Sequence, residues 1–116
     1  MTVVENVTRG TTLADRAETA RSPLAQLVGL MGKRELAAGS GLVFPRTRGV
    51  HTHFMRFPID VVFYDKRGTV VDVVHALRPW RFSPYHWRAA GVVELPAGSA
   101  RAARTETGDV LSIRPA

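Results

Sequence analysis

A chain of 116 residues has room for one domain with one hydrophobic core. Hydrophobic residues make up 45% of the chain, but no apolar run approaches the roughly 18 residues of a membrane-spanning helix, which excludes that class. Cysteine is absent, which excludes disulfides and thiol catalysis, and a formal net charge of +6 favours anionic partners.

The first third of the chain predicts two extended segments, a helix and a short strand. Residues 2–8 and 11–18 are extended segments around an Arg-Gly turn. A helix is expected over 22–32, because a serine and a proline open the segment, apolar residues recur every three or four positions, and a glycine ends it. A buried strand follows at 42–44. The N-terminal residues show no basic start followed by an apolar stretch, which predicts a cytoplasmic protein.

The middle of the chain predicts three strands. Residues 50–55 form the first, and a Phe-Pro pair ends it. Residues 59–65 and 69–75 form a hairpin whose turn has aspartate at its first position and Gly68 at its fourth. This pattern is typical of a type I turn followed by a left-handed glycine, so we expect a positive φ at Gly68.

The same turn predicts the register of the hairpin. It pairs Phe63 with Val71, which places an apolar face on the core. The other face then carries Asp60, Tyr64 and Asp72, and is expected to meet solvent or to line a half-open cavity.

The last third predicts a loop, two strands and a helical turn. Residues 77–89 form a loop rich in arginine and aromatic side chains. Strands are expected at 90–95 and 110–114, and one helical turn at 99–103. The sum is a compact, β-rich α+β domain over residues 1–116, with a mainly antiparallel sheet and one clear helix.

Polar residues beside apolar ones indicate a candidate binding site. Arg56 and Asp60 flank a Phe-Pro turn, and Glu94 is an acid inside an apolar strand. We predict that Arg56, Asp60 and Glu94 converge in one partly buried polar cluster beside Met55. Trp80, in the arginine-rich loop, is a further ligand-binding candidate, and the positive charge favours an anionic or polar ligand.

Other interpretations stay open. An Asp60–Arg56 pair can simply hold the turn, and Asp60 or Glu94 can act as the acid–base group of a hydrolase or lyase. The arginine and aromatic loop allows weak, sequence-blind nucleic-acid binding. His51 and His53 share a face of a predicted strand, but two ligands do not make a metal site, and no cofactor is predicted.

Blocks of residues in a fixed order also carry a family resemblance: Gly29–Leu36, Gly41–Phe44, His51–Phe63 with the Gly68 turn, Leu77–Arg81, Val93–Gly98 and Gly108–Asp109. Over residues of about 20–113 the chain resembles the uncharacterised bacterial and archaeal domain-of-unknown-function family 192. The resemblance implies a compact, β-rich α+β fold and no established reaction, cofactor or partner. The family usually has another residue at His53, which argues against a family-wide metal site there.

Overall fold

A computed structural model describes residues 1–20 and 36–116, which form one seven-stranded sheet in the order β5-β4-β6-β3-β2-β1-β7. The parallel pair is β2–β3, and the other neighbouring strands are antiparallel. The strands are β1 (Thr2–Asn6), β2 (Thr11–Thr19), β3 (Ser40–Pro45), β4 (Ile59–Tyr64), β5 (Val70–Leu77), β6 (Gly91–Pro96) and β7 (Leu111–Pro115), and helix α2 spans Ser99–Ala102. The α+β class with a mainly antiparallel sheet is confirmed. The helix expected over 22–32 lies outside the described residues.

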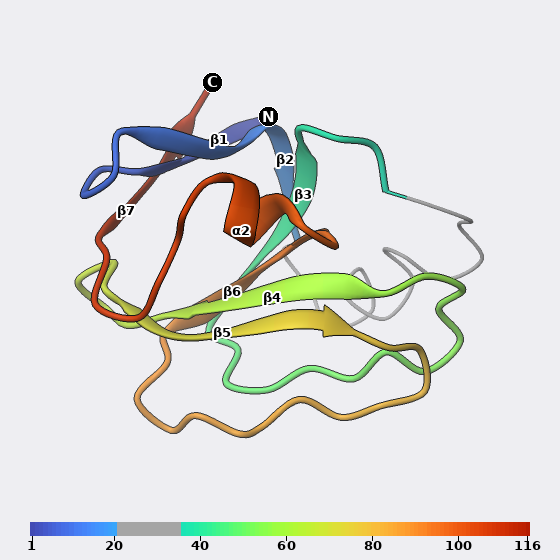
Figure 1. Cartoon of the computed structure of the whole chain (residues 1–116). Coiled ribbons are helices and arrows are strands. Elements are labelled where there is room, and N and C mark those ends of the chain that lie inside the picture. Colours follow the sequence, from blue (N-terminus) through green and yellow to red (C-terminus); the bar gives the residue numbers. More distant parts are fainter. Residues whose placement is uncertain (21–35) are drawn as a thin grey trace.

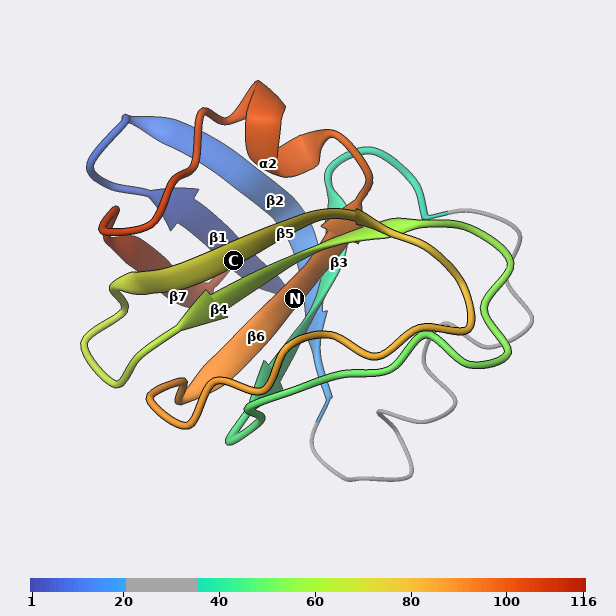
Figure 2. The ribbon, with the colours of Figure 1, turned by 60° about the horizontal axis from the view of Figure 1, so that its bottom comes forward.

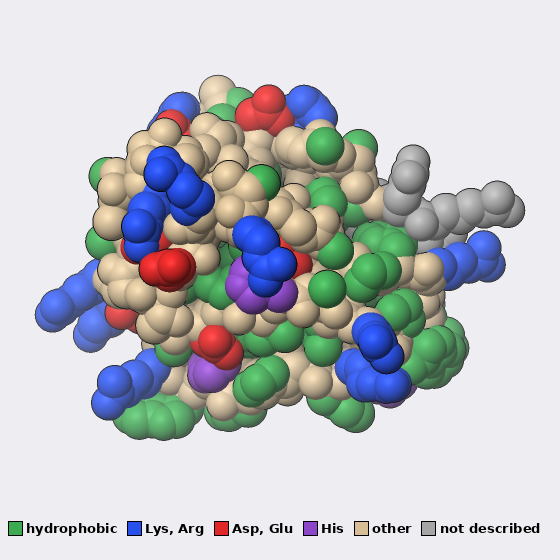
Figure 3. Space-filling view, viewed as in Figure 1, with side chains coloured by type: hydrophobic (Ala, Val, Ile, Leu, Met, Phe, Trp, Pro, Cys, Tyr) green, Lys and Arg blue, Asp and Glu red, His purple; other side chains and the backbone are tan. Residues whose placement is uncertain are grey.

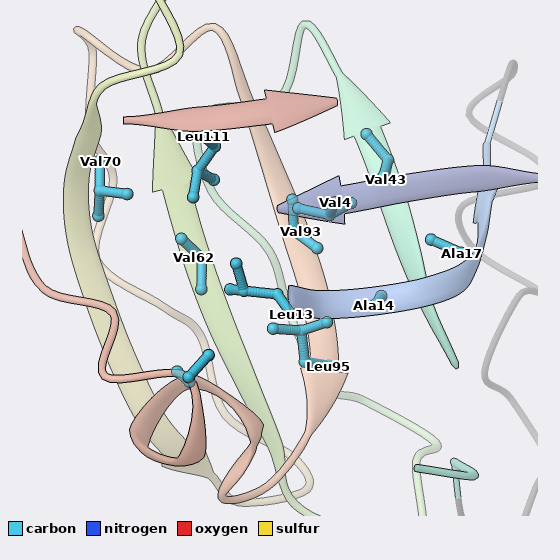
Figure 4. Close-up of a cluster of buried hydrophobic side chains, with 12 residues drawn as sticks. Val4, Leu13, Ala14, Ala17, Val43, Val62, Val70, Val93, Leu95 and Leu111 are labelled. Carbon is cyan, nitrogen blue, oxygen red and sulfur yellow. The ribbon is translucent and has the colours of Figure 1, made fainter. Parts of the chain in front are cut away.

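The sheet is strongly curled, and its concave face encloses the larger core. Figures 1 and 2 show β1, β2 and β7 crossing over β4, β5 and β6. The Leu111 N–H donates to the Gly68 carbonyl at 2.8 Å, which joins the β4–β5 turn to β7. Helix α2 covers one end of this concave face (Figure 4). The core there contains Val4, Leu13, Ala14, Ala17, Val43, Val62, Val70, Val93, Leu95, Ala100, Ala103 and Leu111.

The convex face carries a second core beneath two loops, residues 46–58 and 78–90. Its buried members are Ala20, Leu42, Phe44, Met55, Phe57, Ile59, Val61, Phe63, Ala89 and Val92. The second loop is held down by His86, whose ring packs against Phe63 with centroids 4.6 Å apart and whose Nε2 lies 2.8 Å from Asp72 Oδ2. Both faces of the hairpin are therefore covered, and the expectation of one solvent-facing or half-open face is wrong. Among the described residues, no helix has the length and apolarity to cross a bilayer.

The register of the hairpin is correct near the turn, shifts by one residue beyond it, and shifts again at the far end, where Ile59 pairs with Leu77. Tyr64 pairs with Val70 as predicted, but Phe63 pairs with Asp72 instead of Val71. The irregularity between these pairs leaves Val71 as the extra residue of a bulge, which bends and twists the strand. Asp72 therefore shares the face of Phe63, and the prediction that Asp60 and Asp72 share a face is wrong.

The Gly68 turn forms as predicted. Gly68 has a φ of +83°, its N–H donates to the Asp65 carbonyl at 2.9 Å, and the Asp65 N–H donates to the Thr69 carbonyl at 2.9 Å. A Cβ on Gly68 would lie 2.7 Å from the Leu111 carbonyl oxygen, closer than van der Waals contact allows. This glycine is needed both for the turn and for the approach of β7.

Replacing Gly68 by valine is expected to lower the free energy of unfolding by about 2 kcal/mol, because left-handed backbone and a backbone contact both oppose a side chain. Gly10→Val is the matched control, since Gly10 has a φ of +68° and nothing within 4 Å of an added Cβ. Urea denaturation of both variants should show the larger loss for Gly68→Val. Equal losses would mean that the Leu111 contact contributes nothing.

Candidate functional site

Asp60, on β4, is fully buried and accepts three backbone N–H groups from two other segments. Its Oδ1 accepts the Ala76 N–H at 2.8 Å, and its Oδ2 accepts the N–H groups of Gly98 and Ala100 at 3.0 Å each. Ala76 has a φ of +50°, an unusual conformation for alanine that this bond supports. The carboxylate therefore joins β4, the end of β5 and the start of α2.

The predicted cluster of Arg56, Asp60 and Glu94 does not form. Asp60 pairs with Leu95 and Val61 pairs with Glu94 across β4 and β6, so the two acids project from opposite faces of the sheet. Arg56 is exposed and forms no ion pair within the described parts of the chain. Convergence was predicted from position in the sequence, but side chains alternate along strands, and the register between two distant strands decides which ones meet.

Glu94 is an acid in an apolar setting on the convex face. Its side chain is flanked across the sheet by Leu42 and Val61, and only 5% of the residue is exposed. No hydrogen bond to its carboxyl group comes from residues 1–20 or 36–116. Burial raises the pKa of Glu94 to about 8, so the group is mostly protonated at neutral pH. Met55 is buried in the core of this same face.

The two loops of the convex face form a hydrogen-bonded ribbon, which we call the loop ribbon (residues 46–58 and 78–90). The Thr52 N–H donates to the Arg81 carbonyl, the Ser83 N–H to the Val50 carbonyl and the His86 N–H to the Arg48 carbonyl, each at 2.9 Å. The β-pairing between the two described loops is a single isolated bridge, between His51 and Phe82. Phe54 has a φ of +68°, which a regular strand does not contain. The strand predicted at 50–55 is therefore wrong, because its hydrogen bonds go to an irregular loop.

The loop ribbon exposes large aromatic side chains. Every Phe, Tyr or Trp that the described chain exposes lies on it, with exposed fractions of 53–75%: Phe54, Trp80, Phe82, Tyr85 and Trp87. The space-filling view shows apolar side chains beside Lys and Arg along the lower edge (Figure 3), where Figure 1 places the two loops.

The two ribbon histidines pack as aromatic rings. The centroids of His51 and His53 lie 5.1 Å apart, and the His53 ring also lies 5.4 Å from Trp80. His51 Nδ1 accepts the His53 N–H at 3.3 Å. Within the described residues, no group of three or more His, Cys, Asp or Glu side chains is placed to hold a metal ion. The geometry of this pair is that of packed rings.

One end of the loop ribbon forms an open groove of about 1330 Å³ against the β4–β5 turn. It is lined by residues 46–51, 65–67, 82, 83, 85 and 87–90, including five exposed cationic side chains: Arg46, Arg48, Lys66, Arg67 and Arg88. None of these five forms an ion pair with a described residue. The groove has one acid, Asp65, whose Oδ1 accepts the N–H groups of Arg67 and Thr69 at 2.9 Å each.

Three of the exposed aromatic residues, Phe82, Tyr85 and Trp87, also line the groove. The guanidinium carbon of Arg88 lies 5.4 Å from the centre of the Trp87 ring, a cation–π contact. The sequence indicated the aromatic loop but not the groove, because the cations come from three segments that only folding brings together.

Comparisons with known proteins agree with this fold. The model of domain-of-unknown-function family 192, described as "Uncharacterized ACR", matches residues 4–113. A UPF0127 protein of Pyrococcus furiosus is 34% identical over 109 residues, covering 91% of this chain and 93% of its own. A UPF0127 protein of Thermococcus sibiricus is 32% identical over 108 residues, covering 90% and 70%.

Two solved structures are similar in fold. A protein of unknown function from Novosphingobium aromaticivorans has a TM-score of 0.81 at 22% identity, with 96% of this chain and 82% of that chain covered. A protein of Sinorhizobium meliloti 1021, provisionally assigned as a transcription regulator, has a TM-score of 0.77 at 27% identity, with 96% and 90% covered.

Proposed function

The chain belongs to domain-of-unknown-function family 192, and from this starting point we propose that it is a binding domain whose groove takes an anionic ligand. The observation that carries the proposal is the set of five cationic side chains around one recess, none of which forms an ion pair with residues 1–20 or 36–116. Like charges that line one recess repel one another, and an anion that enters the recess relieves that repulsion. Sulfate, phosphate and carboxylate groups all have the required charge.

The five site residues predicted from sequence stay a prediction for ligand binding. Arg56 and Trp80 are exposed on the loop ribbon and available to a ligand. Met55 and Asp60 are buried, so direct contact with a ligand is expected of neither. The cytoplasmic location also stays a prediction.

The proposal is tested by calorimetric titration of the protein with inorganic tripolyphosphate at low salt. The double variant Arg48→Gln/Arg88→Gln removes two groove cations and is expected to weaken binding at least tenfold. Arg78→Gln/Arg81→Gln is the matched control: it changes the net charge equally and lies on the same ribbon but outside the groove. The control should lose less than about threefold. Equal losses in the two variants would show that net charge alone attracts the anion.

A second candidate function is general acid–base catalysis of a hydrolase or lyase type. Glu94 stays a candidate for the acid–base group, and Asp60 does not. The Asp60 carboxylate is occupied by backbone N–H groups. Glu94 is supported by its burial, which raises its pKa to about 8, so that near neutral pH it can both donate and accept a proton. A carboxyl titration of Glu94 near pH 8, followed by carbon-13 NMR, is required for this function. A titration below pH 5 would eliminate it.

A further inference from the structure

We propose that the anion bound in the groove is a single-stranded nucleic acid, whose phosphates meet the groove cations and whose bases stack on the groove aromatics. This inference rests on the proposed function and names its ligand class. Phe82, Tyr85 and Trp87 are 75%, 68% and 69% exposed although they are among the largest apolar side chains of the chain. A simple inorganic anion makes no use of aromatic faces, whereas bases stack on them whatever their sequence.

The size of the groove favours a segment of polymer. Pockets for small molecules usually have volumes of roughly 300–1,000 Å³. The groove, at about 1330 Å³, is larger and open, and its cations come from separate segments: Arg46 and Arg48 from one loop, Lys66 and Arg67 from the hairpin turn. A chain that carries a phosphate at every repeat can contact several of these cations at once.

The aromatic side chains favour a single strand over a duplex. Bases in a duplex are stacked on each other and do not offer their faces to protein side chains. Among the described residues, no helix lies at this surface to enter the major groove of a duplex, since α2 has four residues and lies away from it. The groove therefore suits unpaired bases.

The shape of the site favours nucleic acid over an anionic membrane. Arginines beside exposed aromatics also occur on proteins that dock at bilayer interfaces. The three aromatics line a recess together with the cations, however, and a bilayer surface does not follow a recess closely. Arg88 lies over Trp87 at 5.4 Å, so one cation and one stacking surface are already held together for a phosphate and its base.

The experiment measures the binding of the protein to a fluorescein-labelled oligothymidylate of ten nucleotides by fluorescence anisotropy. We expect this single strand to bind at least tenfold more tightly than a duplex of equal length. The affinity of the duplex is measured by competition of the unlabelled duplex with the labelled oligothymidylate. The logarithm of the affinity should fall with the logarithm of salt concentration with a slope of about −2 or steeper, as for three or more phosphate contacts.

The double variant Tyr85→Leu/Trp87→Leu keeps apolar bulk and removes the stacking faces. It should weaken oligothymidylate binding about tenfold or more but tripolyphosphate binding by less than about threefold, because the inorganic anion loses only the cation–π support of Arg88. Phe54→Leu is the control, because this exposed aromatic lies on the loop ribbon outside the groove. Circular dichroism melts establish that each variant is folded.

Three outcomes would overturn the inference: equal binding of single strand and duplex, no effect of Tyr85→Leu/Trp87→Leu, or co-sedimentation with phosphatidylserine vesicles in place of oligonucleotide binding. If tripolyphosphate binding still depends on Arg48 and Arg88 in these cases, the anion-binding function stands and only its ligand class is wrong. If tripolyphosphate binding does not depend on them, the proposed function fails as well.

Discussion

Replacing Asp60 by asparagine is expected to lower the free energy of unfolding by about 3 kcal/mol. The carboxylate accepts N–H groups from Ala76, Gly98 and Ala100 while fully buried. An asparagine has one acceptor oxygen, and its NH2 group would face at least one of these backbone donors. The variant loses charge-assisted hydrogen bonds and leaves a buried donor unpaired, and each of these effects is costly. Urea denaturation at neutral pH measures the change.

Asp15→Asn is the control for the loss of a carboxylate as such. Asp15 is exposed and pairs with Arg16, also exposed, at 3.1 Å, so its replacement should change the unfolding free energy by less than about 0.5 kcal/mol. The sequence left open whether Asp60 holds the structure together or binds a ligand, and the two roles predict different losses of stability. A ligand-binding carboxylate can be removed at little cost in stability. A loss as small as that of Asp15→Asn would restore the ligand-binding interpretation.

The stability of the protein is expected to fall between pH 5 and pH 9 because of Glu94. Burial raises its pKa to about 8 in the folded state, whereas an unfolded glutamate titrates near pH 4.5. The folded state therefore holds this proton more tightly, and the stability that the proton contributes is complete below about pH 4.5 and is lost as pH rises through 8. The decrease should be on the order of 2–4 kcal/mol, measured by urea denaturation across this range.

Glu94→Gln isolates this contribution, because it keeps the shape of the side chain and removes the titrating proton. The variant should have a flatter stability profile and exceed the wild type in stability above pH 8.

Asp109 acts in the opposite direction and at lower pH. Burial alone would raise the pKa of Asp109, but hydrogen bonds from Asn6, the Glu106 N–H and Arg9 outweigh burial and lower it.

The stability that Asp109 contributes is present above its unfolded pKa of about 3.8 and is lost as pH falls through its lower folded value. Above pH 5 the contribution of Asp109 to stability is therefore constant. Parallel profiles of wild type and Glu94→Gln over pH 5–9 would mean that Glu94 is ionised and hydrated in the native protein.

The Gly68 turn and all the predicted strands except that at 50–55 could be predicted from the sequence because their determinants are local. A strand of alternating or continuous β-branched residues and a turn with aspartate and glycine at set positions are specified by neighbours in the chain. The arginine and aromatic loop was recognisable for the same reason, since prolines and arginines interrupt any periodic pattern there.

The faces of the strands were decided only by tertiary structure. Val70, Val71, Val73 and Val74 suit either face of a sheet that is covered on both, so the sequence pattern is blind to the bulge that shifts the register by one residue. The shift moved Asp72 to the face of the loop ribbon, where His86 binds it.

The site was likewise decided by pairing between distant segments. Asp60 and Glu94 both look like acids poised for function when each strand is considered alone. The offset between β4 and β6 separates them: one carboxylate meets backbone N–H groups at α2, and the other meets apolar side chains on the convex face. The groove cations also come from three segments that are far apart in the chain. Local sequence determines which conformation a segment prefers, but the net free energy of burial and hydrogen bonding over the whole fold determines which side chains meet.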